Sequence, residues 1–211
     1  MGLWQCLMRS PETIVFDLGG VLIDWNPRYL YRKIFDTEEK VSWFLQHVCT
    51  PEWNEKQDGG RTFAEANREL ITRFPEYAQA INAWYARWPE TIGGPIQGTV
   101  NILSKLHQEK EHRLYALTNW SAETFPWAKD HFDFLGWFEG IVVSGDEKML
   151  KPDVAFYQVL LSRYKVIPSK SLFIDDNILN VEGAKAAGMD AIHFTSHQQL
   201  KEDLRRKGVS V

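Results

Sequence analysis

The apolar run at residues 14–16 leads directly into Asp17, and Gly19 and Gly20 follow within three residues. A short apolar run bounded by glycines is typical of a buried strand, which places the Asp17 carboxylate at the carboxyl end of a sheet. In open parallel α/β sheets, ligands bind at that edge. The glycines allow a sharp turn and leave room for a ligand beside the backbone. This stretch therefore favours an α/β fold with a functional site after its first strand.

Strands and helices alternate along the chain after residue 95. The predicted strands are Leu114–Leu117, Ile141–Val143, Leu172–Ile174 and Ala191–Phe194, and the predicted helices are Ile96–Lys110, Ser121–Phe132, Asp153–Lys165, Val181–Ala187 and His197–Arg206. This alternation predicts βαβ units with right-handed crossovers and a parallel, Rossmann-like sheet.

Residues 25–92 interrupt the alternation, because their apolar positions recur at helical spacing only. The expected elements are a helix start at Pro27 capped by Asn26, helices Glu38–Val48, Phe63–Phe74 and Tyr77–Trp88, a loop over Thr50–Arg61, and a return hinge at Gly93-Gly94-Pro95. The chain is thus expected to divide into an α/β core, residues 1–24 and 93–211, and an inserted all-helical cap, residues 25–92.

Composition excludes several classes of protein. Of 211 residues, 44% are hydrophobic and 25% are charged, as in an ordinary globular chain, and the net charge of −4 gives no support for nucleic-acid or membrane-surface binding. Two cysteines, Cys6 and Cys49, do not form a disulfide framework, so a reduced cytoplasmic setting is expected. The N-terminal residues do not resemble a signal peptide, and no segment has the roughly 20 apolar residues that a membrane span needs.

Asp17 is the candidate nucleophile. A carboxylate can attack phosphorus or carbon and form a covalent ester, which divides one difficult step into two. The alternative is an aspartate that caps a turn after a strand. The choice depends on the polar residues that follow the other predicted strands.

Two adjacent acids, Asp175 and Asp176, follow a later apolar strand. Adjacent carboxylates at a buried strand end are costly unless a cation neutralises them. Mg²⁺ prefers oxygen ligands, usually one or two carboxylates with water and phosphate. We therefore expect a magnesium site made of Asp17, the backbone carbonyl of Gly19, and Asp175, Asp176 or both. A pair of helix-capping acids is the alternative.

Thr118 and Asn119 end another predicted strand, and Lys151 stands directly before Pro152, where a helix is expected to begin. A hydroxyl together with backbone N–H groups at a helix start can hold a phosphate oxygen. A lysine offers a compact positive charge to that phosphate and to Asp17. Taken singly, these residues have ordinary alternatives as a strand threonine and a surface lysine.

Together these segments (FDLGG, ALTNW, LKPD and FIDDNILN) resemble the ordered motifs of the haloacid dehalogenase (HAD) superfamily of aspartate-nucleophile hydrolases. The resemblance spans residues 14–194 and is closest to the small-capped sugar-phosphate phosphatases whose first motif also reads DLG. It implies a HAD core with a helical cap, Asp17 and Lys151 as catalytic residues, phosphate binding by Thr118, Asn119 and Lys151, and Asp176 as the favoured direct ligand of magnesium.

One departure from the family pattern concerns Gly19. Most phosphatases of the family carry a second aspartate there, which protonates the leaving oxygen and later activates water. General acid–base help of this kind contributes about 10²–10⁴-fold, and glycine cannot supply it. Asp24, His47 and Asp58 are possible substitutes, and the sequence does not choose among them.

These observations predict a magnesium-dependent phosphate-monoester hydrolase that acts on a small phosphorylated metabolite, such as a sugar phosphate, through an aspartyl-phosphate on Asp17. One alternative is a haloacid dehalogenase, for which Gly19 would be harmless because a halide leaves without a proton. The other is a non-catalytic binding or regulatory protein that kept the fold. The oligomeric state cannot be read from the sequence.

Overall fold

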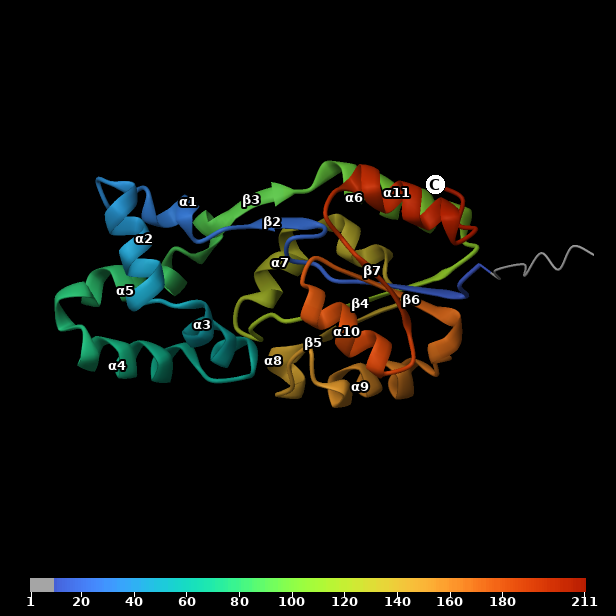
Figure 1. Cartoon of the computed structure of the whole chain (residues 1–211). Helices are drawn as coiled ribbons and strands as arrows, with labels where there is room; N and C mark the ends of the chain where they lie inside the picture. The colour runs from blue at the N-terminus through green and yellow to red at the C-terminus, as the bar shows by residue number, and fades with distance from the viewer. Residues whose placement is uncertain (1–9) are drawn as a thin grey trace, which may run out of the picture.

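Five parallel strands form the centre of the structure, a computed structural model that describes residues 10–211 (Figure 1). Their order across the sheet is β5-β4-β1-β6-β7. The strands are β1 (Thr13–Phe16), β4 (Arg113–Thr118), β5 (Gly140–Val143), β6 (Ser171–Asp175) and β7 (Asp190–His193). Phe16 at the end of β1 pairs with Ala116 of β4 and Ile174 of β6, so the carboxyl ends of these three strands meet. The predicted α/β class with a parallel sheet is confirmed.

Helices cover both faces of this sheet. Ile14 and Phe16 belong to one buried apolar cluster, and Val15 belongs to a second, as the alternation of side chains along a strand requires. The first cluster includes side chains of α6 (Gln97–Glu109), α7 (Phe125–His131) and α11 (His197–Arg206), and the second those of α9 (Val154–Tyr164) and α10 (Ile178–Ala186). The remaining short elements here are α8 (Ser144–Glu147), η3 (Asp133–Trp137) and η4 (Pro168–Lys170).

A second lobe lies beside the sheet and is connected to it by an antiparallel ribbon of β2 (Ile23–Trp25) and β3 (Ile92–Pro95) (Figure 1). All elements between these two strands are helical: α1 (Arg28–Tyr31), α2 (Glu38–His47), α3 (Pro51–Asp58), α4 (Phe63–Arg73), η1 (Pro75–Tyr77), α5 (Ala78–Ala86) and η2 (Trp88–Thr91). The division of the chain into a core and a cap domain at residues 25 and 92 stays a prediction.

The predicted loop over Thr50–Arg61 is wrong, because most of it is helix α3. The Thr50 side chain accepts a hydrogen bond from the Trp53 backbone, and Pro51 occupies the first turn, where its missing N–H costs nothing. After Trp53 the helix is entirely polar, and it buries only Trp53 and Gln57, so it lacks the apolar periodicity that marks a helix in sequence.

Three further boundaries differ from the prediction. Gly93-Gly94-Pro95 lies within β3 rather than in a free hinge, and Gly93 is required there because a Cβ would come within 2.1 Å of Asp24 Oδ2. Helix α7 begins at Phe125 rather than at Ser121, since residues 121–124 form a turn. Helix α10 begins at Ile178, three residues before the predicted start at Val181, because the Asn177 side chain caps it.

Cys49 is buried and unpaired, whereas Cys6 lies outside the described residues. Over residues 10–211, none of the helices has the length and apolar character needed to cross a lipid bilayer.

Ser144 links the two lobes. It is fully buried, and its hydroxyl donates a hydrogen bond to the carbonyl of Asp58 in α3 at 2.6 Å and accepts one from the backbone N–H of Trp120 at 2.9 Å. One side chain therefore holds the end of α3 against the loop that follows β4.

Replacing Ser144 with alanine should lower the free energy of unfolding by about 1–3 kcal/mol, because it leaves the buried N–H of Trp120 and the partly buried carbonyl of Asp58 without this partner. Urea denaturation followed by circular dichroism measures this change. The matched control is Ser162→Ala on the exposed face of α9, which should change stability little. Equal stabilities of the two variants would contradict the linking role.

Candidate active site

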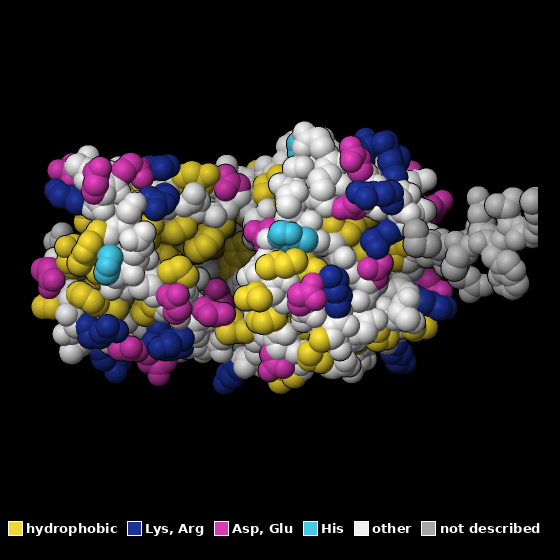
Figure 2. All heavy atoms as spheres, in the orientation of Figure 1, with side chains coloured by type: hydrophobic (Ala, Val, Ile, Leu, Met, Phe, Trp, Pro, Cys, Tyr) yellow, Lys and Arg dark blue, Asp and Glu magenta, His cyan; other side chains and the backbone are white. Residues whose placement is uncertain are grey.

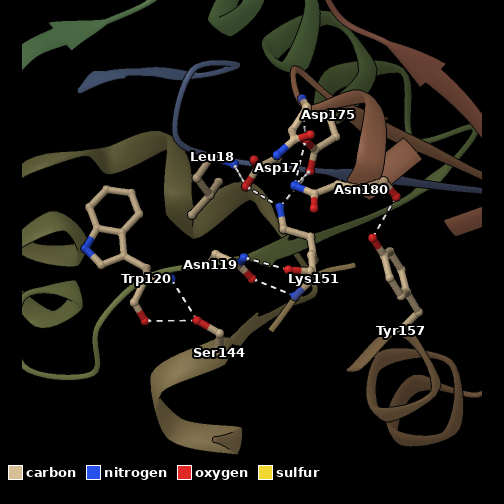
Figure 3. A network of polar contacts seen from close by, with 10 residues as sticks. Asp17, Leu18, Asn119, Trp120, Ser144, Lys151, Tyr157, Asp175 and Asn180 are labelled. Atoms are coloured by element: carbon tan, nitrogen blue, oxygen red, sulfur yellow. Dashed lines mark hydrogen bonds and ion pairs between the residues drawn. The ribbon is translucent and has the colours of Figure 1, made fainter. Parts of the chain in front are cut away.

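Asp17 follows β1 directly and points toward the ends of the neighbouring strands (Figure 3). It is 7% exposed. Its Oδ1 atom accepts a hydrogen bond from the Leu18 backbone N–H at 2.7 Å and lies 2.8 Å from Lys151 Nζ. One carboxylate oxygen is therefore fixed by the protein, and Oδ2 is the less engaged of the two.

Lys151 is buried between two carboxylates. Its ammonium group lies 2.8 Å from Asp17 and 2.7 Å from Asp175 Oδ2, and the residue is 1% exposed (Figure 3). Burial lowers the pKa of Lys151, but the two negative charges outweigh this effect and raise it above its ordinary value. The lysine is thus held in its charged form.

The side chain of Asn119 positions this lysine. Its Oδ1 atom accepts a hydrogen bond from the Lys151 backbone N–H at 2.9 Å, and its Nδ2 donates to the Lys151 carbonyl at 3.1 Å. Both ends of the amide are therefore engaged with Lys151, and the phosphate binding expected of Asn119 stays a prediction.

Asp175 is completely buried at the end of β6 and accepts hydrogen bonds on both oxygens. Oδ1 accepts hydrogen bonds from the Asn177 backbone N–H at 2.8 Å and from Asn180 Nδ2 at 3.0 Å. Oδ2 accepts one from Lys151 Nζ at 2.7 Å. Asn180 was not among the predicted site residues. Its position five residues after Asp175, on the first turn of a helix that starts beside the site, is the signal that could have identified it.

Asp17, Asp175 and Asp176 form an acidic cluster, since each offers a carboxylate oxygen within 4.8 Å of the others. Burial, followed by the neighbouring charge of Asp175, raises the pKa of Asp176. Burial also raises the pKa of Asp17 to about 7, although Lys151 opposes this effect. Three carboxylates against one ammonium group leave an excess of negative charge, and a divalent cation with a preference for oxygen suits such a donor set. Gly19 lies in the turn directly after Asp17.

The hydroxyl of Thr118 lies at the end of β4, next to β1 in the sheet. The residue is fully buried, and its Oγ1 atom has no hydrogen-bond partner among the described residues. Because buried polar groups nearly always have a partner, this hydroxyl is available to a ligand.

A pocket of about 470 Å³, partly open to solvent, lies between the two lobes. Figure 2 shows this region as a hollow with hydrophobic side chains at its depth. Its lining residues are Gly19, Trp25, Asn54, Asp58, Tyr85, Trp88, Asn119, Trp120, Ser121 and Thr124. Trp120 is buried and also lines the pocket.

The three possible substitutes for the missing acid lie in different places. Asp24 accepts a hydrogen bond from the Tyr29 hydroxyl at 2.7 Å within the ribbon region. His47 is exposed and stacks on Trp43. Of the three, Asp58 alone is among the described residues that line the pocket.

Fold and site together define a hydrolase with a buried aspartate–lysine pair at the carboxyl edge of a parallel sheet. The family model for haloacid dehalogenase-like hydrolases matches residues 11–188, so the chain belongs to that family and is an enzyme of this class. The resemblance inferred from the four motifs is thereby confirmed.

Two curated relatives are similar over nearly their whole length. The sesquiterpene phosphatase astK of Aspergillus oryzae is 27% identical, with 92% of this chain and 95% of that protein covered. The D-ribitol-5-phosphate phosphatase of Bacteroides thetaiotaomicron is 20% identical, with 92% and 96% covered.

Among solved structures, a HAD family enzyme from Bacteroides thetaiotaomicron in complex with magnesium matches with a TM-score of 0.73 at 19% identity, covering 93% of this chain and 100% of that one. The putative HAD-hydrolase YfnB from Bacillus subtilis, bound to magnesium, matches with a TM-score of 0.72 at 20% identity and the same coverage. These similarities show that the fold is shared.

The acidic cluster makes stability depend on pH. The folded-state pKa of Asp17 is about 7, above the ordinary 3.8, so its contribution to stability is fully present below about pH 4 and is lost as the pH rises through about 7. In chelator-treated protein, the free energy of unfolding of the parent should therefore fall relative to that of Asp17→Asn over this range. Urea titrations at several pH values measure the difference, and a difference independent of pH would contradict it.

Proposed function

We propose that the protein is a magnesium-dependent phosphatase that cleaves phosphate monoesters of small metabolites through an aspartyl-phosphate on Asp17. The observation that carries the proposal is the buried contact of Lys151 with Asp17 and Asp175, next to the unpartnered hydroxyl of Thr118. Lys151 and Thr118 supply a charge and a hydrogen bond to a phosphate, and Asp17 supplies the attacking oxygen. Both relatives described above bear names of phosphatases, which supports this reaction class.

The reaction proceeds in two displacements. Asp17 Oδ2 attacks the phosphorus, the bond to the leaving oxygen breaks, and the departing alkoxide takes a proton from water. Water then attacks the phosphorus, which releases inorganic phosphate and restores the carboxylate. Lys151 stabilises the negative charge of the transferring group and orients Asp17, while Asp175 and Asn119 hold Lys151 in position.

Mg²⁺ would be held by Asp17, Asp176 and the backbone carbonyl of Gly19, with Asp175 at the same edge. When bound, the ion neutralises the charge of the carboxylates and of the phosphate. It would also offset the burial that raises the pKa of Asp17 to about 7, and so keep the nucleophile ionised.

The acidic cluster also bears on the two alternative functions. A dehalogenase of this family works without a metal, and three carboxylates within 4.8 Å of one another are poorly suited to such a site. A non-catalytic protein would not need a buried lysine held by two carboxylates and an amide, an arrangement that is costly to bury. We therefore favour the phosphatase over both.

The direct test is the release of phosphate from 4-nitrophenyl phosphate. We expect turnover that requires added Mg²⁺ and that Asp17→Asn lowers by at least about a thousandfold, because asparagine keeps the shape but is not a nucleophile. The variant should retain the circular dichroism of the parent. Turnover in Asp17→Asn above about a tenth of the parent's rate would refute the assignment.

Gly19 makes the rate sensitive to the leaving group. Without a general acid at this position, aryl phosphates should react much faster than alkyl phosphates, because a phenolate leaves without a proton. The described backbone has no positive φ at Gly19, and a Cβ placed there meets no atom within 4 Å. The backbone at this position therefore accepts a Cβ without strain.

Gly19→Asp should raise the turnover of alkyl phosphates relative to aryl phosphates, by about tenfold or more, if the new carboxyl group protonates the leaving oxygen. The ratio of the two rates, measured in parent and variant under the same conditions, gives the result. Gly20→Asp is the negative control. It should not raise this ratio, because φ is +73° there and a Cβ would come within 2.2 Å of Asp176. A parent whose rate is independent of the leaving group would show that another residue already acts as the acid.

A further inference from the structure

Aromatic side chains form much of the wall of the pocket between the lobes. Trp25 comes from β2, Tyr85 from α5, Trp88 from η2, and Trp120 from the loop after β4. Trp88 and Trp120 contact each other, with ring centroids 5.6 Å apart. The faces of such rings carry partial negative charge and attract cations, most strongly where water is excluded.

The polar side chains of the pocket include an acidic group and no basic one. Asp58 carries the only carboxyl group among the ten lining residues, which include no lysine, arginine or histidine. Its Oδ2 atom accepts a hydrogen bond from Asn54 Nδ2 at 3.0 Å. Burial and the nearby charge of Glu55 raise the pKa of Asp58 to about 7. Asp58 thus gives the pocket a carboxyl group that has no basic partner among the described residues that line it.

Arg61, three residues after the end of α3, has other hydrogen-bond partners. Arg61 donates its hydrogen bonds to Gln57, to Glu69 and to the Trp53 carbonyl. The hydroxyl of Tyr85 is buried and has no hydrogen-bond partner among the described residues. It adds an unused oxygen to a pocket that already has an excess of negative charge.

The pocket adjoins the proposed phosphate site. Gly19, two residues after Asp17, and Asn119, the neighbour of Thr118, both line its sheet side. A phosphate held by Thr118 and Lys151 would therefore direct its ester group toward the pocket. The chemistry of the pocket then determines which ester group is bound.

We propose that this pocket binds the positively charged end of an amino-alcohol phosphate, with choline phosphate as the reference ligand. The aromatic walls surround the quaternary ammonium group, and Asp58 neutralises its charge. This inference rests on the proposed phosphatase function, because the phosphate site fixes the other end of the same ligand.

The cationic leaving group also bears on Gly19. A positive charge close to the leaving oxygen stabilises the alkoxide that forms when the bond to phosphorus breaks. Such an alcohol needs less help from a general acid than a neutral alcohol does. The missing carboxylate at Gly19 and the acidic aromatic pocket are therefore consistent with one class of substrate.

The test compares choline with its uncharged analogue of the same shape, 3,3-dimethylbutanol, in calorimetric titrations of the parent protein. We expect choline to bind at least about tenfold more tightly, since only choline carries the charge. Asp58→Asn should weaken choline binding by about tenfold or more and leave the neutral analogue unaffected. The matched control, Asp36→Asn, removes an exposed carboxylate of the same lobe and should change neither affinity.

A second variant, Trp25→Leu, keeps an apolar side chain but removes the ring, and should selectively weaken choline binding even if Asp58→Asn fails to fold. Equal binding of the two ligands, tighter binding of the neutral one, or no binding of choline would each overturn the proposal. None of these measurements requires turnover. Choline binding without turnover of 4-nitrophenyl phosphate would refute the proposed function while keeping the cation site.

Discussion

A lysine ammonium group buried between two carboxylates is the interaction on which the site depends. Lys151 contacts Asp17 and Asp175 from the end of a loop, whereas the two acids come from neighbouring strands of the sheet. Removing one member of such a group leaves an uncompensated buried charge, which is far more costly than losing a surface ion pair. Two features keep this group together. The strand order places β1 beside β6, and the amide of Asn119 holds the Lys151 backbone.

Negative charge exceeds positive charge on both sides of Gly19. On the sheet side, three carboxylates face one lysine, and on the side of the second lobe Asp58 has no basic partner among the lining residues. Charges of one sign are not brought together in a folded protein without compensation. Different cations suit the two places: a hard divalent ion among oxygen atoms, and a large, weakly hydrated organic cation among aromatic rings. A phosphate ester of an amino alcohol would connect them, because its phosphate and its ammonium group lie at opposite ends.

The parallel sheet and the cluster of Asp17, Lys151 and Asp175 were predictable, because apolar runs define buried strands and the edge of a parallel sheet collects the residues that follow them. Helix α3 was not predictable, since its sequence is polar and its stability comes from capping and from contacts with the other lobe. The bond of Asn119 to Lys151 joins residues 32 positions apart, and sequence spacing alone carries no information about such a contact. The pocket was missed for the same reason, because its aromatic walls come from three distant stretches of sequence, at Trp25, at residues 85–88 and at Trp120.

Helix α3 forms part of the proposed cation site. It supplies Asn54 and Asp58 to the pocket, and its last carbonyl is fixed by Ser144, which also fixes the backbone of Trp120. One buried hydroxyl thus sets the distance between the carboxylate of one lobe and the aromatic ring of the other. A shift of α3 would move the proposed cation site away from the phosphate site without altering Asp17 or Lys151. Under the proposed function, the contact between the lobes would therefore govern which ester group is accepted, and the residues at the edge of the sheet would govern how the phosphate bond is broken.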